Sequence, residues 1–164
     1  MKLHEYQAKQ LLAGAGIPIQ RGRPARTPEE AARAYDVLRH ECLPAPPQNF
    51  GGAQAGGGAD GFVCNIKAQL HAGGRGKAGG ILVAASALQA AEHARALLGR
   101  RLVTKQTGTD GLPVSAVLVD ERIAGAVELY LAITNDRFRA TPVILASRQG
   151  GVDIEDVAAK DPRA

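Results

Sequence analysis

A glycine-rich loop over residues 72–80 carries the densest chemical signal in the sequence, and Lys67 lies shortly before it. Glycines at this density let successive backbone N–H groups turn toward one point, and such concave backbone segments bind phosphate oxygens. Arg75 and Lys77 add positive charge within the loop, and an arginine grips two oxygens at once. The pattern therefore predicts a phosphate-binding site, with Lys67 pointing a single ammonium at the phosphate from a preceding strand.

Composition alone leaves a second interpretation open, in which the same segment is a flexible, solvated basic loop. The spacing matches neither GxxxxGK[ST] nor a strand–GxGxxG–helix unit, so the common nucleotide-binding signatures do not apply. His71 titrates near neutral pH, but a single histidine beside a glycine loop is more often a hinge or hydrogen-bonding residue than a catalyst. Cys42 and Cys64 are far apart and lack metal-ligand spacing, which predicts two reduced thiols.

The elements that must position the loop follow from hydrophobic periodicity and from helix caps. Residues 3–12 predict a helix that two glycines end, and Thr27, Pro28 and Glu30 predict an N-cap, a first helical residue and a capping box for a helix to about Arg39. Ser86 caps a third helix that ends at Leu98. Strands are predicted over residues 62–70, 81–85, 101–106, 116–120, 128–134 and 141–146, with turns at 109–111 and 135–137.

The first two of these strands would form a hairpin-like pair with the glycine loop as its tip. Strands and a few helices without regular βαβ alternation predict an α+β fold rather than a doubly wound sheet. Residues 40–61 interrupt the pattern with prolines and glycines and are expected to form a disordered or mobile excursion.

Charge and hydropathy narrow the classes of partner. The net charge of +4 suits an anionic ligand such as a nucleotide, while lysines and arginines are spread along the chain without interleaved aromatics, which argues against nucleic acid. No apolar run reaches the roughly 18 residues of a membrane span, and the N-terminus lacks the apolar core of a signal peptide. We expect a cytoplasmic protein without a membrane partner.

Several segments, taken together, resemble the β subunits of succinyl-CoA synthetases (succinate–CoA ligases) and of the related malate–CoA ligases. The segments are LHEYQAK at 3–9, KAQLHAGGRGKAGG at 67–80, LVTKQT at 102–107, ELYL at 128–131, ASRQGG at 146–151 and DIE at 153–155. They occur in family order at near-family spacing and cover the chain apart from residues 40–61. The combination is specific, although no single segment is.

The resemblance implies an ATP-grasp fold, in which two α+β lobes clamp a nucleotide. Residues 24–123 would form the first lobe, with the Pro/Gly-rich insertion at about 40–61, and residues 1–23 with 124–164 would form an incomplete second lobe. The implied reaction joins succinate and CoA at the expense of ATP, with GTP as a possible substitute, and uses Mg²⁺. In the family an α subunit carries the phosphohistidine, so none of the four histidines here is expected to be catalytic.

The resemblance also implies which residues contact the nucleotide. A lysine would contact phosphate, a glycine–arginine–glycine flap would cover it, and a strand-end carboxylate, a backbone contact and a second carboxylate would complete the site. A nearby glutamine would face the base and could favour guanine. Carried over position by position, the site residues are Lys67, Gly74, Arg75, Gly76, Asp120, Ile123 and Glu128, and the glutamine is Gln20.

Three features of this chain depart from the family pattern. The Pro/Gly-rich segment precedes the Lys67 strand, and Asp120 stands where the family usually has glutamate. The Asn and Asp ligands of Mg²⁺ and the ligase domain are expected beyond Ala164. A truncated, non-catalytic nucleotide-binding remnant therefore stays open as an alternative. A malate–CoA ligase β subunit is another, because residues 147–151 lean toward malate-type relatives.

Overall fold

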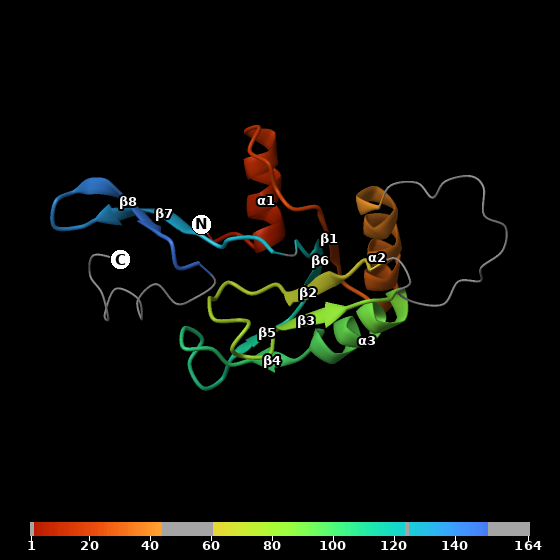
Figure 1. Cartoon of the computed structure of the whole chain (residues 1–164). Helices are drawn as coiled ribbons and strands as arrows, with labels where there is room; N and C mark the ends of the chain where they lie inside the picture. Colours follow the sequence, from red (N-terminus) through yellow and green to blue (C-terminus); the bar gives the residue numbers. More distant parts are fainter. Residues whose placement is uncertain (1, 44–60, 124, 151–164) are drawn as a thin grey trace, which may run out of the picture. The chain divides into compact units, whose positions relative to one another are not determined.

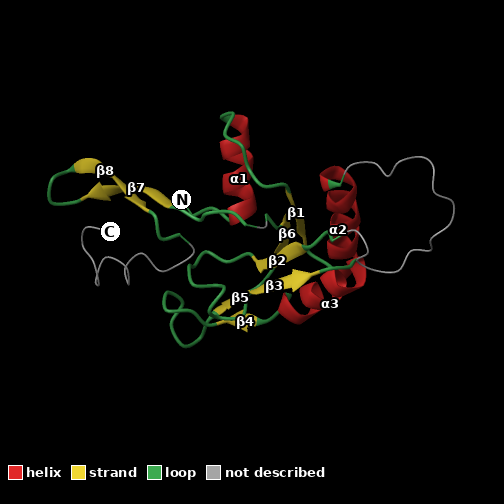
Figure 2. Cartoon of the chain, viewed as in Figure 1, coloured by secondary structure: helices red, strands yellow, loops and turns green. Residues whose placement is uncertain are grey.

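The computed structural model describes residues 2–43, 61–123 and 125–150 (Figure 1). The chain divides into two compact units, Met1–Arg122 and Ile123–Ala164. Each unit is described by itself below. Figure 2 shows the mixture of helices and strands along the chain, which confirms the predicted α+β class.

The first unit is built on an antiparallel four-stranded sheet in the order β1-β6-β2-β3. Two helices, α2 and α3, pack against each other and against the strands, and a small two-stranded sheet follows them. The elements are α1 (Glu5–Gly14), β1 (Gly22–Ala25), α2 (Pro28–Cys42), β2 (Cys64–Ala68), β3 (Ile81–Ala84), α3 (Ala87–Leu97), β4 (Arg101–Leu102), β5 (Leu112–Pro113) and β6 (Val117–Glu121).

Side-chain caps begin the two packed helices as predicted. Thr27 accepts a hydrogen bond from the backbone N–H of Glu30 at 3.2 Å, and Ser86 accepts one from Gln89 at 3.2 Å. The side chain of Glu30 accepts from the backbone N–H of Arg26 at 2.6 Å rather than from that of Thr27, so the reciprocal half of the box is displaced by one residue. Helix α2 continues to Cys42, three residues past the predicted end.

The alternation of side chains on β2 decides which residues face the core. Cys64, Ile66 and Ala68 are buried, while Asn65 and Lys67 point to the other face. The buried cluster joins these residues to side chains of α2, α3 and β6. Because cross-strand partners share a face, Lys67 opposite Leu118 and Asn65 opposite Asp120 lie together on the face away from this core.

The antiparallel pairing of β2 with β3 confirms the predicted hairpin with a glycine-loop tip. Two strands, β1 and β5, escaped prediction. β1 carries Pro24 and lacks an apolar alternation, and it lies at the sheet edge, where proline is tolerated. The strand predicted over residues 101–106 was too long, because Thr104 and Thr107 close a turn in which the Thr104 N–H donates to the Thr107 hydroxyl at 2.8 Å.

In the second unit, β7 (Tyr130–Asp136) and β8 (Thr141–Ser147) form an antiparallel hairpin. The first strand begins and ends two residues later than predicted, so the turn spans residues 137–140 instead of 135–137. The Asp136 carboxylate fixes this turn, since it accepts from the backbone N–H groups of Phe138 at 2.9 Å and Arg139 at 3.1 Å.

The division into units differs from the predicted division into lobes, because residues 1–23 fall within the first unit. Lobes are defined in a complete ATP-grasp domain. The assignment of residues 1–23 and 124–164 to one lobe therefore stays a prediction. Most of the predicted insertion, residues 44–60, lies outside the described residues.

Cys42 and Cys64 are both free thiols, and Cys64 is buried. Each helix that the described residues form is too short or too polar to cross a bilayer.

Candidate functional site

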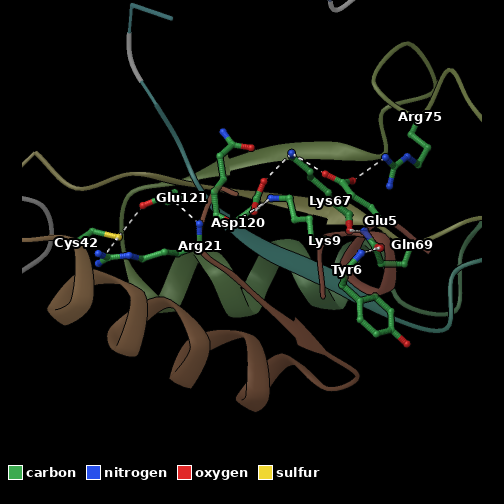
Figure 3. Close-up of polar contacts among 11 residues, drawn as sticks. Glu5, Tyr6, Lys9, Arg21, Cys42, Lys67, Gln69, Arg75, Asp120 and Glu121 are labelled. Atoms are coloured by element: carbon green, nitrogen blue, oxygen red, sulfur yellow. Dashed lines mark hydrogen bonds and ion pairs between the residues drawn. The ribbon is translucent and has the colours of Figure 1, made fainter. Parts of the chain in front are cut away.

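Lys67 lies on β2 at the centre of a chain of charged side chains (Figure 3). Its ammonium donates to the carboxylate of Asp120 at 2.7 Å and to that of Glu5 at 3.1 Å. The side chain is 15% exposed. An ammonium has three N–H donors, so these two contacts leave one for a further acceptor.

Asp120 is the buried end of this chain, with a side chain that is 0% exposed. One carboxylate oxygen accepts from Lys67, and the other pairs with the ammonium of Lys9 on α1. Lys9 also donates to the backbone carbonyl of Gln20 at 3.4 Å. The structure thus places Asp120 as the shared counterion of two lysines, and its predicted contact with a nucleotide stays a prediction.

Arg75, in the glycine loop, is the other end of the chain. Its guanidinium donates to the Glu5 carboxylate at 2.7 Å and to the carbonyl of Ala68, at the end of β2, at 2.8 Å. Its own carbonyl accepts from the N–H of Gly80 at 2.7 Å. Side chain and backbone of Arg75 therefore both hold the loop closed on its own base.

The charges of this cluster support one another. Burial raises the pKa of Glu5, but Lys67 and Arg75 outweigh burial and hold that pKa below its ordinary value. Burial likewise lowers the pKa of Lys67, but Asp120 and Glu5 outweigh burial and hold it above its ordinary value. Glu5 is therefore an anion and Lys67 a cation across the physiological pH range.

The loop itself presents backbone donors. The N–H groups of Gly73, Ala78 and Gly80 have acceptors within the loop or on Gln106. Among the described residues, by contrast, the consecutive N–H groups of Gly74, Arg75 and Gly76 have no acceptor. Gly74 has φ +74°, the left-handed conformation that turns successive amides inward and that favours glycine. Adjacent backbone donors of this kind can bind phosphate oxygens.

The first unit brings together five of the seven predicted site residues: Lys67, Gly74, Arg75, Gly76 and Asp120. The other two, Ile123 and Glu128, belong to the second unit. Ile123 is 55% exposed, and the backbone carbonyl of Glu128 accepts from the N–H of Gly150 at 3.0 Å. Their roles toward a nucleotide stay predictions.

Sequence reasoning missed Glu5 and Lys9, although both lie in a segment that carries the family resemblance. They are four residues apart, so they share one face of α1. That shared face is a signal that could have predicted ion pairs with the lysine strand and the glycine loop. None of the residues of α1 is buried, so polar contacts, rather than an apolar face, attach this helix to the sheet. Gln69 adds one such contact, because its side chain accepts from the N–H of Tyr6 at 3.3 Å.

His71 stacks on His4 with ring centroids 4.0 Å apart. Burial, together with the charges of His71 and Arg75, lowers the pKa of His4. An open hollow of about 460 Å³ adjoins the pair and is lined in part by Glu5 and Arg75.

Within residues 2–43, 61–123 and 125–150, His, Cys, Asp and Glu side chains form no group of three that could hold a metal ion. The Mg²⁺ that the family resemblance implies therefore stays a prediction for this chain.

Comparison with known families defines the class. Residues 56–164, more than half of the chain, match the family model of the ATP-grasp domain. The chain belongs to the ATP-grasp family, as the sequence motifs predicted.

The curated relatives narrow the resemblance further. The chain is 44% identical, over its whole length, to the β subunit of an ADP-forming succinate–CoA ligase of Persephonella marina, of which it covers 37%. It is 44% and 47% identical, over 99% of its length, to subunits of the same name from Geobacter sulfurreducens and Wolinella succinogenes, of which it covers 36% each. The chain thus spans about 37% of the length of these relatives, and it matches their N-terminal part.

Proposed function

We propose that this chain is the nucleotide-binding part of an ADP-forming succinate–CoA ligase β subunit. The complete reaction would join succinate and CoA to succinyl-CoA while ATP becomes ADP and phosphate. The similarity to subunits of that name supports the reaction. The site in the first unit supports the part assigned to this chain, which is to hold the nucleotide phosphates.

One observation carries the proposal: three consecutive N–H groups without acceptors, at Gly74, Arg75 and Gly76, lie in a loop whose arginine joins the Lys67 ion-pair chain. Phosphate oxygens are strong acceptors, and phosphoryl transfer depends mainly on positioning and on charge stabilisation. Bound there, a nucleotide would accept from the loop amides and from the remaining donor of Lys67.

The nucleotide base is proposed to contact the predicted site residues that follow the glycine loop in the sequence. Asp120 would mark the end of the strand beside the base, Ile123 would offer its backbone, and Glu128 would add a carboxylate. ATP is the proposed nucleotide, because the relatives are named for forming ADP. GTP is the comparison nucleotide, since Gln20 could donate to a guanine oxygen.

The remaining parts of the proposal concern the complete enzyme. Mg²⁺ would neutralise phosphate charge during transfer, held by residues other than those described here. A separate α subunit would carry the phosphohistidine, and the enzyme would work in the cytoplasm. Thioester formation after adding an α subunit and the remainder of a relative's β subunit would test whether this chain takes part in turnover.

Calorimetry with the 164-residue chain tests nucleotide binding directly. Lys67→Ala removes a charge-assisted contact and should weaken ATP binding by about 1.5–3 kcal/mol. Arg23→Ala is the matched control, because it removes a cation whose partner, Glu41, lies on the surface of the same unit. Equal affinities of the wild-type and Lys67→Ala chains would refute the phosphate contact, and absence of ATP binding by the wild-type chain would refute the proposal.

A further inference from the structure

The side chain of Arg75 does something other than what its position in a phosphate loop suggests. The guanidinium donates to the carbonyl of Ala68, at the base of the loop, at 2.8 Å. It also donates to the carboxylate of Glu5 at 2.7 Å (Figure 3). The backbone N–H of Arg75 is left without an acceptor among the described residues. The side chain therefore anchors the loop while the backbone offers the donor.

Glu5 is the residue that receives this anchor. Its two carboxylate oxygens are divided between two cations: one oxygen accepts from Lys67 at 3.1 Å and the other from Arg75 at 2.7 Å. The three side chains come from α1, β2 and the glycine loop, so one carboxylate joins three separate elements. It stands in the first turn of α1, where the helix dipole favours an anion.

We propose that Glu5 is a positioning residue for nucleotide phosphates: by bridging Arg75 and Lys67 it holds the free loop amides and the Lys67 ammonium in one arrangement before the ligand arrives. The inference rests on the proposed nucleotide function and deepens it. Without Glu5, two cations on different elements would repel each other, and the loop would lose its attachment to α1.

Two effects of opposite sign make the inference testable. A carboxylate near the phosphates repels them, so Coulomb's law alone predicts that removing Glu5 tightens the binding of a polyanion. Loss of preorganisation predicts the reverse, because the binding reaction would then have to order the loop. Glu5 contacts Lys67 at 3.1 Å and Arg75 at 2.7 Å, so its loss would release both cations at once. We therefore expect the loss of preorganisation to outweigh the loss of repulsion.

The experiment compares Glu5→Gln with Glu41→Gln in the full chain. Glu41 pairs with Arg23 on the surface of the same unit, and its side chain is 39% exposed. Both variants gain one positive charge, so Glu41→Gln measures the effect of net charge alone. Dissociation constants for ATP and for inorganic tripolyphosphate are measured by calorimetry.

Glu5→Gln should raise the dissociation constants of both ligands on the order of fivefold relative to Glu41→Gln, as is usual for coupled members of one ion-pair network. Glu5→Asp should recover part of the affinity, because it keeps the charge on a shorter arm. Affinity of Glu5→Gln equal to or tighter than that of Glu41→Gln would overturn the inference while leaving the proposed function intact.

Hydrogen exchange of the nucleotide-free chain supplies a readout that separates the two proposals. The hydrogen-bonded amides of Gly73, Ala78 and Gly80 should exchange faster in Glu5→Gln and in Arg75→Lys than in the wild-type chain, while those of β6 should not change. Unchanged loop exchange would show that Glu5 does not anchor the loop. If the wild-type chain binds neither ATP nor tripolyphosphate, the proposed function fails, and the exchange result still decides whether the anchor exists.

Discussion

The two units of this chain treat their apolar residues in opposite ways. In the first unit, β2 and β6 bury Ile66, Val117 and Val119 against two helices. In the second unit, Ile133 and Ile144 face each other across the hairpin and are 75% and 68% exposed. The described residues of the second unit leave these side chains uncovered, and a two-stranded hairpin is marginally stable alone.

The difference shows where a precise site can be built. Lys67, Arg75 and Asp120 are fixed because their strands and loop stand on a packed core. Ile123 and Glu128 belong to the second unit, whose described residues include no buried hydrophobic cluster. The ion pairs of the candidate site therefore stand on the unit with a packed core.

The largest difference in stability should appear when an isoleucine is replaced by alanine in each unit. Ile66→Ala removes a fully buried side chain and should lower the free energy of unfolding by about 2–5 kcal/mol. Ile133→Ala removes an exposed one and should change it by about 0.5 kcal/mol or less. Urea unfolding followed by circular dichroism measures both, and equal effects would erase the distinction between the units.

A smaller effect should appear as a dependence on pH that resides in the first unit. The folded-state pKa of Glu5 is below its ordinary value, so its ion pairs contribute stability that is fully present above that ordinary value and is lost as the pH falls through the folded-state pKa. The wild-type chain should therefore lose more stability than Glu5→Gln on acidification below about pH 4.5.

Urea midpoints of the wild-type chain and of Glu5→Gln, measured at a series of pH values from neutrality into the acid range, would show whether their stabilities converge as the pH falls. Glu41→Gln serves again as the control for a change in surface charge. A constant difference between the wild-type chain and Glu5→Gln at all pH values would mean that the Glu5 ion pairs do not contribute to folding.

The smallest effect is expected in the second unit. Asp136→Ala removes the carboxylate that accepts from Phe138 and Arg139, so the hairpin turn should open more often. Hydrogen exchange should accelerate in residues 130–147, whereas the urea midpoint of the first unit should stay within error of the wild-type value. A shift of that midpoint would show that the two units unfold as one.

Local signals predicted much of the fold. Thr27 and Ser86 mark helix starts because a side-chain oxygen can satisfy an orphan N–H without help from the rest of the chain. The alternation around Lys67 and the glycine run after it predicted the hairpin and its tip. The pattern did not predict β1 and β5, since an edge strand with a proline and a strand of two residues are defined by their partners and not by their own pattern.

The sequence by itself determined the class of chemistry: a lysine on a strand, a glycine loop with an arginine and a carboxylate on a neighbouring strand, all within an ATP-grasp family member. Only the tertiary structure decided how those charges are used. Pairing of β2 with β6 brings Asp120 to Lys67, and docking of α1 adds Glu5 and Lys9. Ion pairs act over a few ångströms between residues far apart in the chain, so their partners become known only when the elements are packed.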